Sequence, residues 1–175
     1  MTAEQTPDLE QALAERQKTS KQIVDVDEPQ TKLVIFRLQD RHFAFPGQSI
    51  SEIISGQFDV FYVPGMHASV EGVMNLRGDI QSVLRLNELL QLPDSDTRND
   101  TQKILLGHSN DLQTGIRIDE LLDVTDIPHS QLKSPPESLP AHLKPLVTAL
   151  LEFNGIPVSV LDLDLLLQEW QQHLS

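Results

Sequence analysis

Short apolar runs, each about the length of a strand and each bounded by turn residues, recur along the chain after residue 31. This pattern is typical of an all-β protein built from small barrels or sandwiches. It predicts strands over residues 32–38, 42–45, 58–63, 69–75, 79–86, 103–107, 114–118, 146–153 and 156–161. The last two flank Asn154-Gly155, a pair that favours a two-residue type I′ turn, so they form the clearest hairpin of the sequence.

Apolar residues recur at helical spacing in two places beyond residue 31. Leu86, Leu89 and Leu90 predict one short helix before Pro93. A longer stripe predicts a final helix, capped at its start by Asp162 or Asp164. Because an apolar stripe must be covered, this helix is expected to dock on the strands through Leu163, Leu166, Leu167, Trp170 and Leu174.

Polar segments divide the chain. Residues 1–31 contain no aromatic residue and predict a mobile acidic and polar extension, within which residues 7–16 have the spacing of a short helix. Residues 93–101 have no apolar side chain except the proline ring and form the best internal boundary. Strands on both sides of this loop predict two small β subdomains in one unit over residues 32–175. Several prolines make residues 126–140 an irregular connector.

Composition narrows the classes of partner. The chain has 13 Lys and Arg against 26 Asp and Glu, a net charge of −13, which argues against nucleic acid or an anionic membrane as the main partner. The absence of cysteine excludes disulfides and thiolate metal sites and fits a reducing compartment. The first residues lack the basic end and apolar run of a secretory signal, and no apolar run approaches the roughly 20 residues that span a bilayer. We therefore expect a cytoplasmic protein with no direct membrane insertion.

No arrangement of side chains predicts catalysis or a cofactor. The six histidines are scattered without the spacing of metal ligands, and the eight glycines form no phosphate-binding loop. The acidic loop around Asp94, Asp96 and Asp100 lacks the glycine and the bidentate glutamate that a calcium loop requires. The expected function is therefore contact with other proteins, without enzymatic activity and without a metal or cofactor.

Residues 70–80, with the sequence VEGVMNLRGDI, resemble the signature of the CheW-like domain family, in which a G-V-x-N-L-R-G run joins two strands. The resemblance extends from residue 32 to the C-terminus. It is also carried by spaced features, namely Phe36 with Leu38, Phe43-Ala44-Phe45, Glu52-Ile53, Val63-Pro64, Gly115-Ile116, Ile118-Asp119, Pro135-Pro136 and Leu161-Asp162.

This resemblance implies a mainly β fold of two small five-stranded barrels, similar to Src-homology-3 barrels, with a C-terminal helix. It also implies a non-catalytic adaptor that holds a CheA-class histidine kinase onto the cytoplasmic signalling domain of chemoreceptors, the methyl-accepting chemotaxis proteins, in two-component motility signalling. The alternative hypothesis is a small-ligand-sensing β-barrel module without kinase coupling, whose cavity or groove would bind a metabolite.

The signature also supplies the candidate partner-binding residues. Arg77 has two open interpretations: its guanidinium binds a carboxylate or carbonyl of the partner, or it braces its own turn. Asn75 is the better candidate for bracing the turn, and Gly72 and Gly78 for backbone requirements. Ile80 is a contact if its strand is exposed. The full candidate set is Asn75, Leu76, Arg77, Gly78, Ile80 and Val83; outside it, Ile53 is expected inside the fold with Glu52 bracing it.

Two positions depart from the family pattern just after the signature. Ser82 and Arg85 stand where a proline and an aspartate are common. These residues are expected to make an acidic patch locally basic and to alter the partner surface. Together with the acidic extension, they favour a divergent member of the family, such as one serving a type IV pilus pathway.

Overall fold

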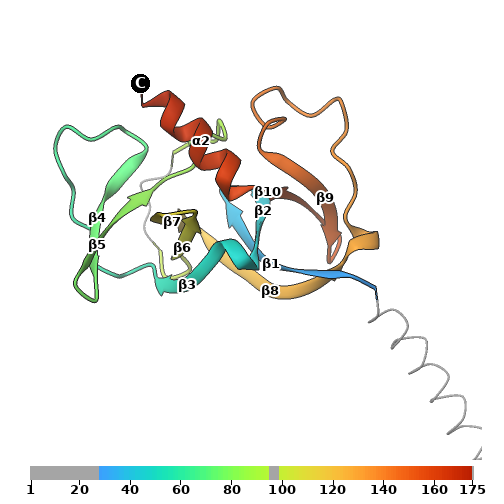
Figure 1. Cartoon of the computed structure of the whole chain (residues 1–175), viewed down its shortest axis with the longest axis horizontal. Helices are drawn as coiled ribbons and strands as arrows, with labels where there is room; N and C mark the ends of the chain where they lie inside the picture. The colour runs from blue at the N-terminus through green and yellow to red at the C-terminus, as the bar shows by residue number, and fades with distance from the viewer. Residues whose placement is uncertain (1–27, 95–98, 175) are drawn as a thin grey trace, which may run out of the picture.

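The computed structural model describes residues 28–94 and 99–174 (Figure 1). Within these residues it contains ten strands, two 3-10 helices and one α-helix. The strands form two five-stranded sheets. The first sheet has the order β8 (Glu120–Pro128), β1 (Gln30–Leu38), β2 (Arg41–Pro46), β10 (Ile156–Leu161) and β9 (Val147–Phe153). The predicted fold class, mainly β with two five-stranded units and a C-terminal helix, is confirmed.

The second sheet repeats the plan of the first. Its order is β3 (Ile50–Ser55), β6 (Lys103–Ser109), β7 (Leu112–Ile118), β5 (Asp79–Leu84) and β4 (Val70–Leu76). In each sheet two antiparallel hairpins meet through a short parallel pairing, β2 with β10 in the first and β7 with β5 in the second. Each parallel pairing joins only two residue positions of each strand, so the strands diverge beyond it.

The chain enters the second sheet early and returns to the first. After β2 it passes through the 3-10 helix η2 (Gly47–Ser49) into β3, and it comes back at β8, which a second 3-10 helix follows, η3 (His129–Gln131). The loop around residues 93–101 joins β5 to β6 within the second sheet. The division between the sheets therefore lies elsewhere than at this polar loop. A polar segment marks a connection between strands, and here the two connected strands belong to one sheet.

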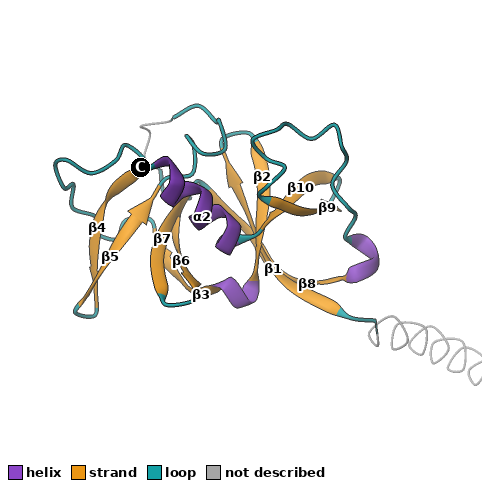
Figure 2. Cartoon of the chain, turned by 45° about the horizontal axis from the view of Figure 1, so that its top comes forward, coloured by secondary structure: helices purple, strands orange, loops and turns teal. Residues whose placement is uncertain are grey.

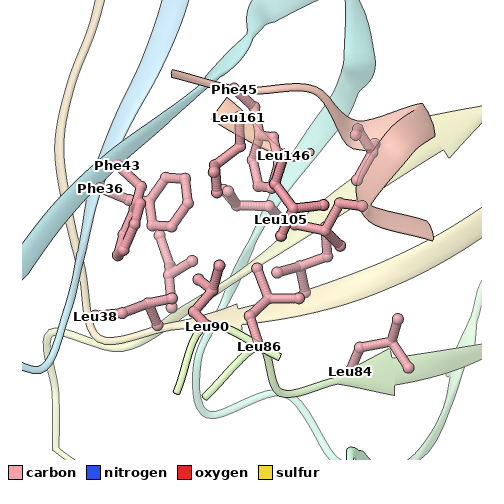
Figure 3. Close-up of a cluster of buried hydrophobic side chains, with 14 of the residues drawn as sticks. Phe36, Leu38, Phe43, Phe45, Leu84, Leu86, Leu90, Leu105, Leu146 and Leu161 are labelled. Carbon is pink, nitrogen blue, oxygen red and sulfur yellow. The ribbon is translucent and has the colours of Figure 1, made fainter. Parts of the chain in front are cut away.

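A shared core joins the two sheets. Phe36, Phe43 and Phe45 of the first sheet pack in one cluster with Leu84 and Leu105 of the second (Figure 3). The rings of Phe36 and Phe45 are stacked with centroids 5.2 Å apart. Each sheet also has a smaller cluster of its own. Because the largest cluster draws on both sheets, neither sheet buries its apolar face alone.

The C-terminal helix α2 (Leu163–His173) lies across the junction of the sheets (Figures 1 and 2). Of the two predicted caps, Asp162 is the one that caps it, accepting a hydrogen bond from the Leu165 N–H at 3.0 Å, while Asp164 lies in the first turn. Leu163, Leu166 and Leu167 are buried in the shared core. The indole N–H of Trp170 donates to the Ser69 hydroxyl at 2.7 Å. Leu174 follows the helix and is exposed, so its predicted place on the buried face is wrong.

Several strand boundaries follow the sequence pattern. The β9–β10 hairpin turns at Asn154 and Gly155, whose φ angles of 50° and 77° are those of the predicted type I′ turn. The strand predicted over residues 58–63 is instead a loop with a single bridge at Phe61, and the short helix predicted around Leu86 is one turn. Strands β3 and β8 were not predicted, and β8 extends to Pro128 inside the expected connector.

The start of β1 lies earlier than the sequence pattern indicates. Gln30 and Thr31 belong to β1 and pair with the end of β8, so the boundary predicted at residue 31 is too late. The Glu28 carboxylate accepts a hydrogen bond from the Ser130 N–H at 2.7 Å, which fixes the chain just before the strand. The rest of the predicted extension, residues 1–27 with the helix over 7–16, lies outside the described residues. In the described part of the chain, α2 is too short and too polar to cross a membrane.

A buried ion-pair cluster ties the second sheet together. The Arg117 guanidinium donates to both carboxylate oxygens of Glu71, at 3.1 and 2.7 Å, and to the Gly56 carbonyl at 2.7 Å. Arg85 donates to the same carboxylate at 3.2 and 3.3 Å. The side chains of Glu71 and Arg117 are only 7% and 5% exposed. Burial alone would raise the pKa of Glu71, but the hydrogen bonds and charges of Arg117 and Arg85 outweigh it and lower the pKa below its ordinary value of 4.5.

We predict that Glu71→Gln lowers the free energy of unfolding by about 3–5 kcal/mol at neutral pH, because it leaves one buried and one half-buried guanidinium without their carboxylate. Urea denaturation of both proteins measures the difference. Since the pKa of Glu71 is lowered in the folded state, its contribution is complete above pH 4.5 and is lost as the pH falls through the folded-state pKa. The difference between the two proteins should therefore shrink as the pH falls. A difference that stays constant down to the acid transition would contradict this role.

Candidate functional site

The signature residues form the β4–β5 hairpin at one end of the second sheet (Figure 1). The two strands pair up to Leu76 and Asp79, and Arg77 and Gly78 make the turn between them. Their φ angles of 52° and 91° place both in the left-handed region, as a two-residue type I′ turn requires. Glycine accepts this conformation without cost, whereas arginine rarely adopts it. The hairpin therefore holds Arg77 at the tip of the sheet in a conformation that the turn dictates.

The side chain of Asn75 braces this turn. Its Oδ1 accepts a hydrogen bond from the Gly78 N–H at 2.9 Å. Gly78 itself has open space around the position that a Cβ would occupy, so it is required for its φ angle and not for close packing. The bracing role predicted for Asn75 is present in the structure.

Arg77 reaches from the turn to β3, the strand at the opposite end of the sheet order. Its guanidinium donates to both carboxylate oxygens of Glu52, at 3.1 and 2.5 Å. The hydrogen bond from Arg77 lowers the pKa of Glu52, and the same pair raises the pKa of Arg77. The Arg77 side chain nevertheless remains 69% exposed. It therefore closes the sheet from β4–β5 to β3 while its guanidinium stays accessible to a partner.

The other candidate residues separate into exposed and buried groups. Ile80 lies opposite Asn75 in the hairpin and is 66% exposed, which is unusual for isoleucine in a strand. Leu76 and Val83 are both buried in the smaller core of the second sheet. The structure thus gives these two a packing role. On β3, Ile53 is exposed and its neighbour Ile54 is buried, so the expectation that Ile53 lies inside is wrong.

The loop between β3 and β4 adds residues that the sequence pattern did not identify as a surface. Phe61 and Tyr62 are 60% and 76% exposed. Phe61 also pairs with Val73 of β4 through two backbone hydrogen bonds of 2.8 and 2.9 Å. Gly72 permits this approach, since a Cβ there would lie 2.3 Å from the Phe61 carbonyl oxygen. Composition could have indicated this surface, because aromatic residues make up only 5% of the chain and two of them are adjacent in this loop.

The two departures from the family pattern have partners inside this sheet. Arg85 pairs with Glu71 and lies 3.9 Å from Asp94, so its charge is matched by carboxylates. The hydroxyl of Ser82 lies 2.9 Å from that of Thr114 on the neighbouring strand β7. The expected gain of local positive charge at Arg85 is therefore offset by Glu71 together with Asp94.

A surface hollow of about 590 Å³ opens beside the turn. The end of β4 and the turn form one wall, and the start of the β3–β4 loop forms the other. Its lining residues are Asn75, Arg77 and Gly78 on the first wall and Gln57, Phe58, Asp59 and Phe61 on the second. The candidate site thus combines a braced turn, an exposed guanidinium, exposed apolar side chains and a hollow.

Comparisons with known proteins agree with this geometry. Residues 32–171 match the family model of the CheW-like domain. The chain is 29% identical over 108 residues to chemotaxis protein CheW of Bacillus subtilis (strain 168), covering 62% of this chain and 68% of that protein. It is 27% identical over 115 residues to chemotaxis protein CheW of Treponema pallidum (strain Nichols), covering 64% and 67%.

The fold is similar to a solved structure as well. The crystal structure of scaffolding protein TtCheW from Thermoanaerobacter tengcongensis superposes with a TM-score of 0.70 at 18% sequence identity. The match covers 79% of this chain and 92% of that chain. At this identity the likeness concerns the fold, and because the match covers 79% of this chain, it includes residues of both sheets.

We predict that Asn75→Ala lowers the free energy of unfolding by about 0.5–1.5 kcal/mol, because the Gly78 N–H loses its acceptor. Asn75→Asp is the matched control, since it keeps an oxygen at the same position. Urea denaturation of the three proteins measures the effect. Equal stability of wild type and Asn75→Ala would remove the bracing role from this side chain.

Proposed function

The chain belongs to the CheW-like domain family, and we propose that it couples a CheA-class histidine kinase to chemoreceptor signalling domains through a surface that includes the β4–β5 hairpin. The main support for the adaptor role is the match of residues 32–171 to the family model. The family is one of non-catalytic coupling proteins, which agrees with the prediction that the chain is not an enzyme. The matched relatives are chemotaxis and scaffolding proteins, so the small-ligand sensor is not favoured.

The exposed end of the hairpin supports the choice of surface. Ile80 offers an apolar side chain that the fold does not use, and Arg77 offers a planar donor group beside it. Protein interfaces draw most of their binding energy from a few such side chains, with arginine strongly represented. A carboxylate or carbonyl of the partner would accept from the guanidinium while an apolar side chain covers Ile80.

The architecture supports simultaneous contact with two partners. Two similar sheets joined by one core present separate strand edges, and a barrel of the kinase would bind at one of them. A helical hairpin of the receptor would bind between the sheets. In this proposal the chain works in the cytoplasm and is held at the receptor array by its partners alone.

We predict that Ile80→Ser weakens capture of the kinase by about tenfold or more without changing the melting temperature, because Ile80 is exposed in the free protein. Val124→Ser is the matched control: Val124 is 42% exposed on β8, which belongs to the other sheet. The measurement is affinity capture from the source cell with the full chain as bait, with the kinase and receptors quantified by mass spectrometry.

The two variants together test whether the hairpin is the contact surface. Loss of capture by Ile80→Ser with normal capture by Val124→Ser supports the hairpin. Equal capture by all three proteins rejects the hairpin as the contact surface. Failure of the wild-type chain to capture either a CheA-class kinase or a receptor rejects the adaptor role itself.

The two interpretations of Arg77 also predict different results. If the guanidinium contacts the partner directly, Arg77→Ala reduces capture whereas Glu52→Gln, which leaves Arg77 in place without its ion pair, retains most of it. If Arg77 acts by closing the sheet onto β3, both variants reduce capture to a similar extent. We expect the first result, since the Arg77 side chain is 69% exposed despite the ion pair, and thermal unfolding checks that both variants remain folded.

A further inference from the structure

The outer edge of β4 is only partly paired with another strand. In the order of the second sheet, β4 lies at one end, so its outer side has no neighbouring strand of full length. Phe61 occupies one position there, exchanging both backbone hydrogen bonds with Val73. This edge can therefore accept an antiparallel strand. Among the residues that the structure describes, Phe61 is the only one that pairs with it.

The next pairing position along the edge is Asn75. Backbone groups of alternate residues point to the same side of a strand, so the N–H and C=O of Asn75 point outward like those of Val73. Continued pairing of the loop would place Asp59 opposite Asn75. The loop instead diverges from β4 before Phe61, and the hollow of about 590 Å³ lies in the resulting space. Asn75 is exposed at its wall.

The walls of the hollow indicate the chemistry of an occupant. Phe58 and Phe61 supply apolar surface. The charge of Arg77 is matched by Glu52, which leaves the carboxylates of Asp59 in the hollow and Asp79 beyond the turn in excess. Asp59 has no ion-pair partner in the part of the chain that the structure describes. The surroundings of the hollow are therefore apolar and acidic, which complements an apolar segment that also carries a cation.

We propose that this hollow binds an extended segment of a partner protein by strand addition to β4. The segment pairs with the backbone of Asn75, places an apolar side chain between Phe58 and Phe61, and directs a Lys or Arg toward Asp59. The volume of the hollow lies in the range of sites that bind small ligands or a few residues of peptide. The inference rests on the proposed function in that the segment belongs to a partner of the adaptor, and it specifies a binding mode separate from the contact at Ile80.

Selection of random peptides of about twelve residues on the immobilised full chain tests the proposal. We expect enriched peptides in which apolar residues alternate with Lys or Arg. When one such synthetic peptide is added, hydrogen exchange at the Asn75 amide should slow by about tenfold or more, because strand addition gives this N–H an acceptor. Enrichment of no peptide, or binding that leaves the Asn75 amide exchange unchanged, would overturn the proposal.

A charge reversal tests the specificity. Asp59→Lys should weaken binding of the basic peptide by about tenfold, whereas Asp126→Lys, at an exposed position on β8 of the other sheet, should leave it within about twofold. Equal effects of the two variants would show that general charge drives binding and would overturn the assigned site. The wild-type capture experiment with kinase and receptors is independent of these results, so failure of the peptide site leaves the adaptor role standing.

Discussion

The carboxylate of Glu71 is the point on which the candidate site depends. It holds a guanidinium on each side, one from Arg117 on β7 and one from Arg85 after β5, and Arg117 extends the cluster to the Gly56 carbonyl. Gly56 begins the loop that carries Phe61, and Glu71 lies on the strand that ends in the signature turn. One buried cluster therefore fixes both walls of the hollow beside that turn. Because removing one partner of a buried ion pair leaves an uncompensated charge, the three side chains act as a unit.

This cluster also gives a physical account of Arg85. The sequence marks Arg85 as a departure from its family, since an aspartate is common there, and the structure shows the compensating charge fourteen residues earlier in the chain. Glu71 and Asp94 together supply two carboxylates for the guanidiniums of Arg85 and Arg117, so the charge of Arg85 is compensated. The exposed guanidinium of the candidate site belongs instead to Arg77, whose partner Glu52 leaves most of it accessible.

Features set by neighbouring residues could be predicted from the sequence. The Asn154-Gly155 turn, the Asp162 cap and the bracing by Asn75 each depend on atoms within a few positions. The missed strands β3 and β8 lie at sheet edges and gain their partners far along the chain, as Glu120 of β8 does opposite Arg37. The assignment of strands to the two sheets could not be predicted for the same reason, since β2 pairs with β10 across more than a hundred residues. Local pattern also could not tell that Ile80 is exposed, because Leu84, which lies on the same face of β5, is fully buried.

We propose that this chain joins a kinase to a receptor, and co-sedimentation is the sharpest test of that role. Receptor-containing membranes from the source cell are mixed with its purified CheA-class kinase, with and without the full chain, and are then centrifuged. We expect the chain to sediment with the membranes and the kinase to follow only when the chain is present. A kinase that sediments equally well without the chain, or a chain that stays in the supernatant, would contradict it.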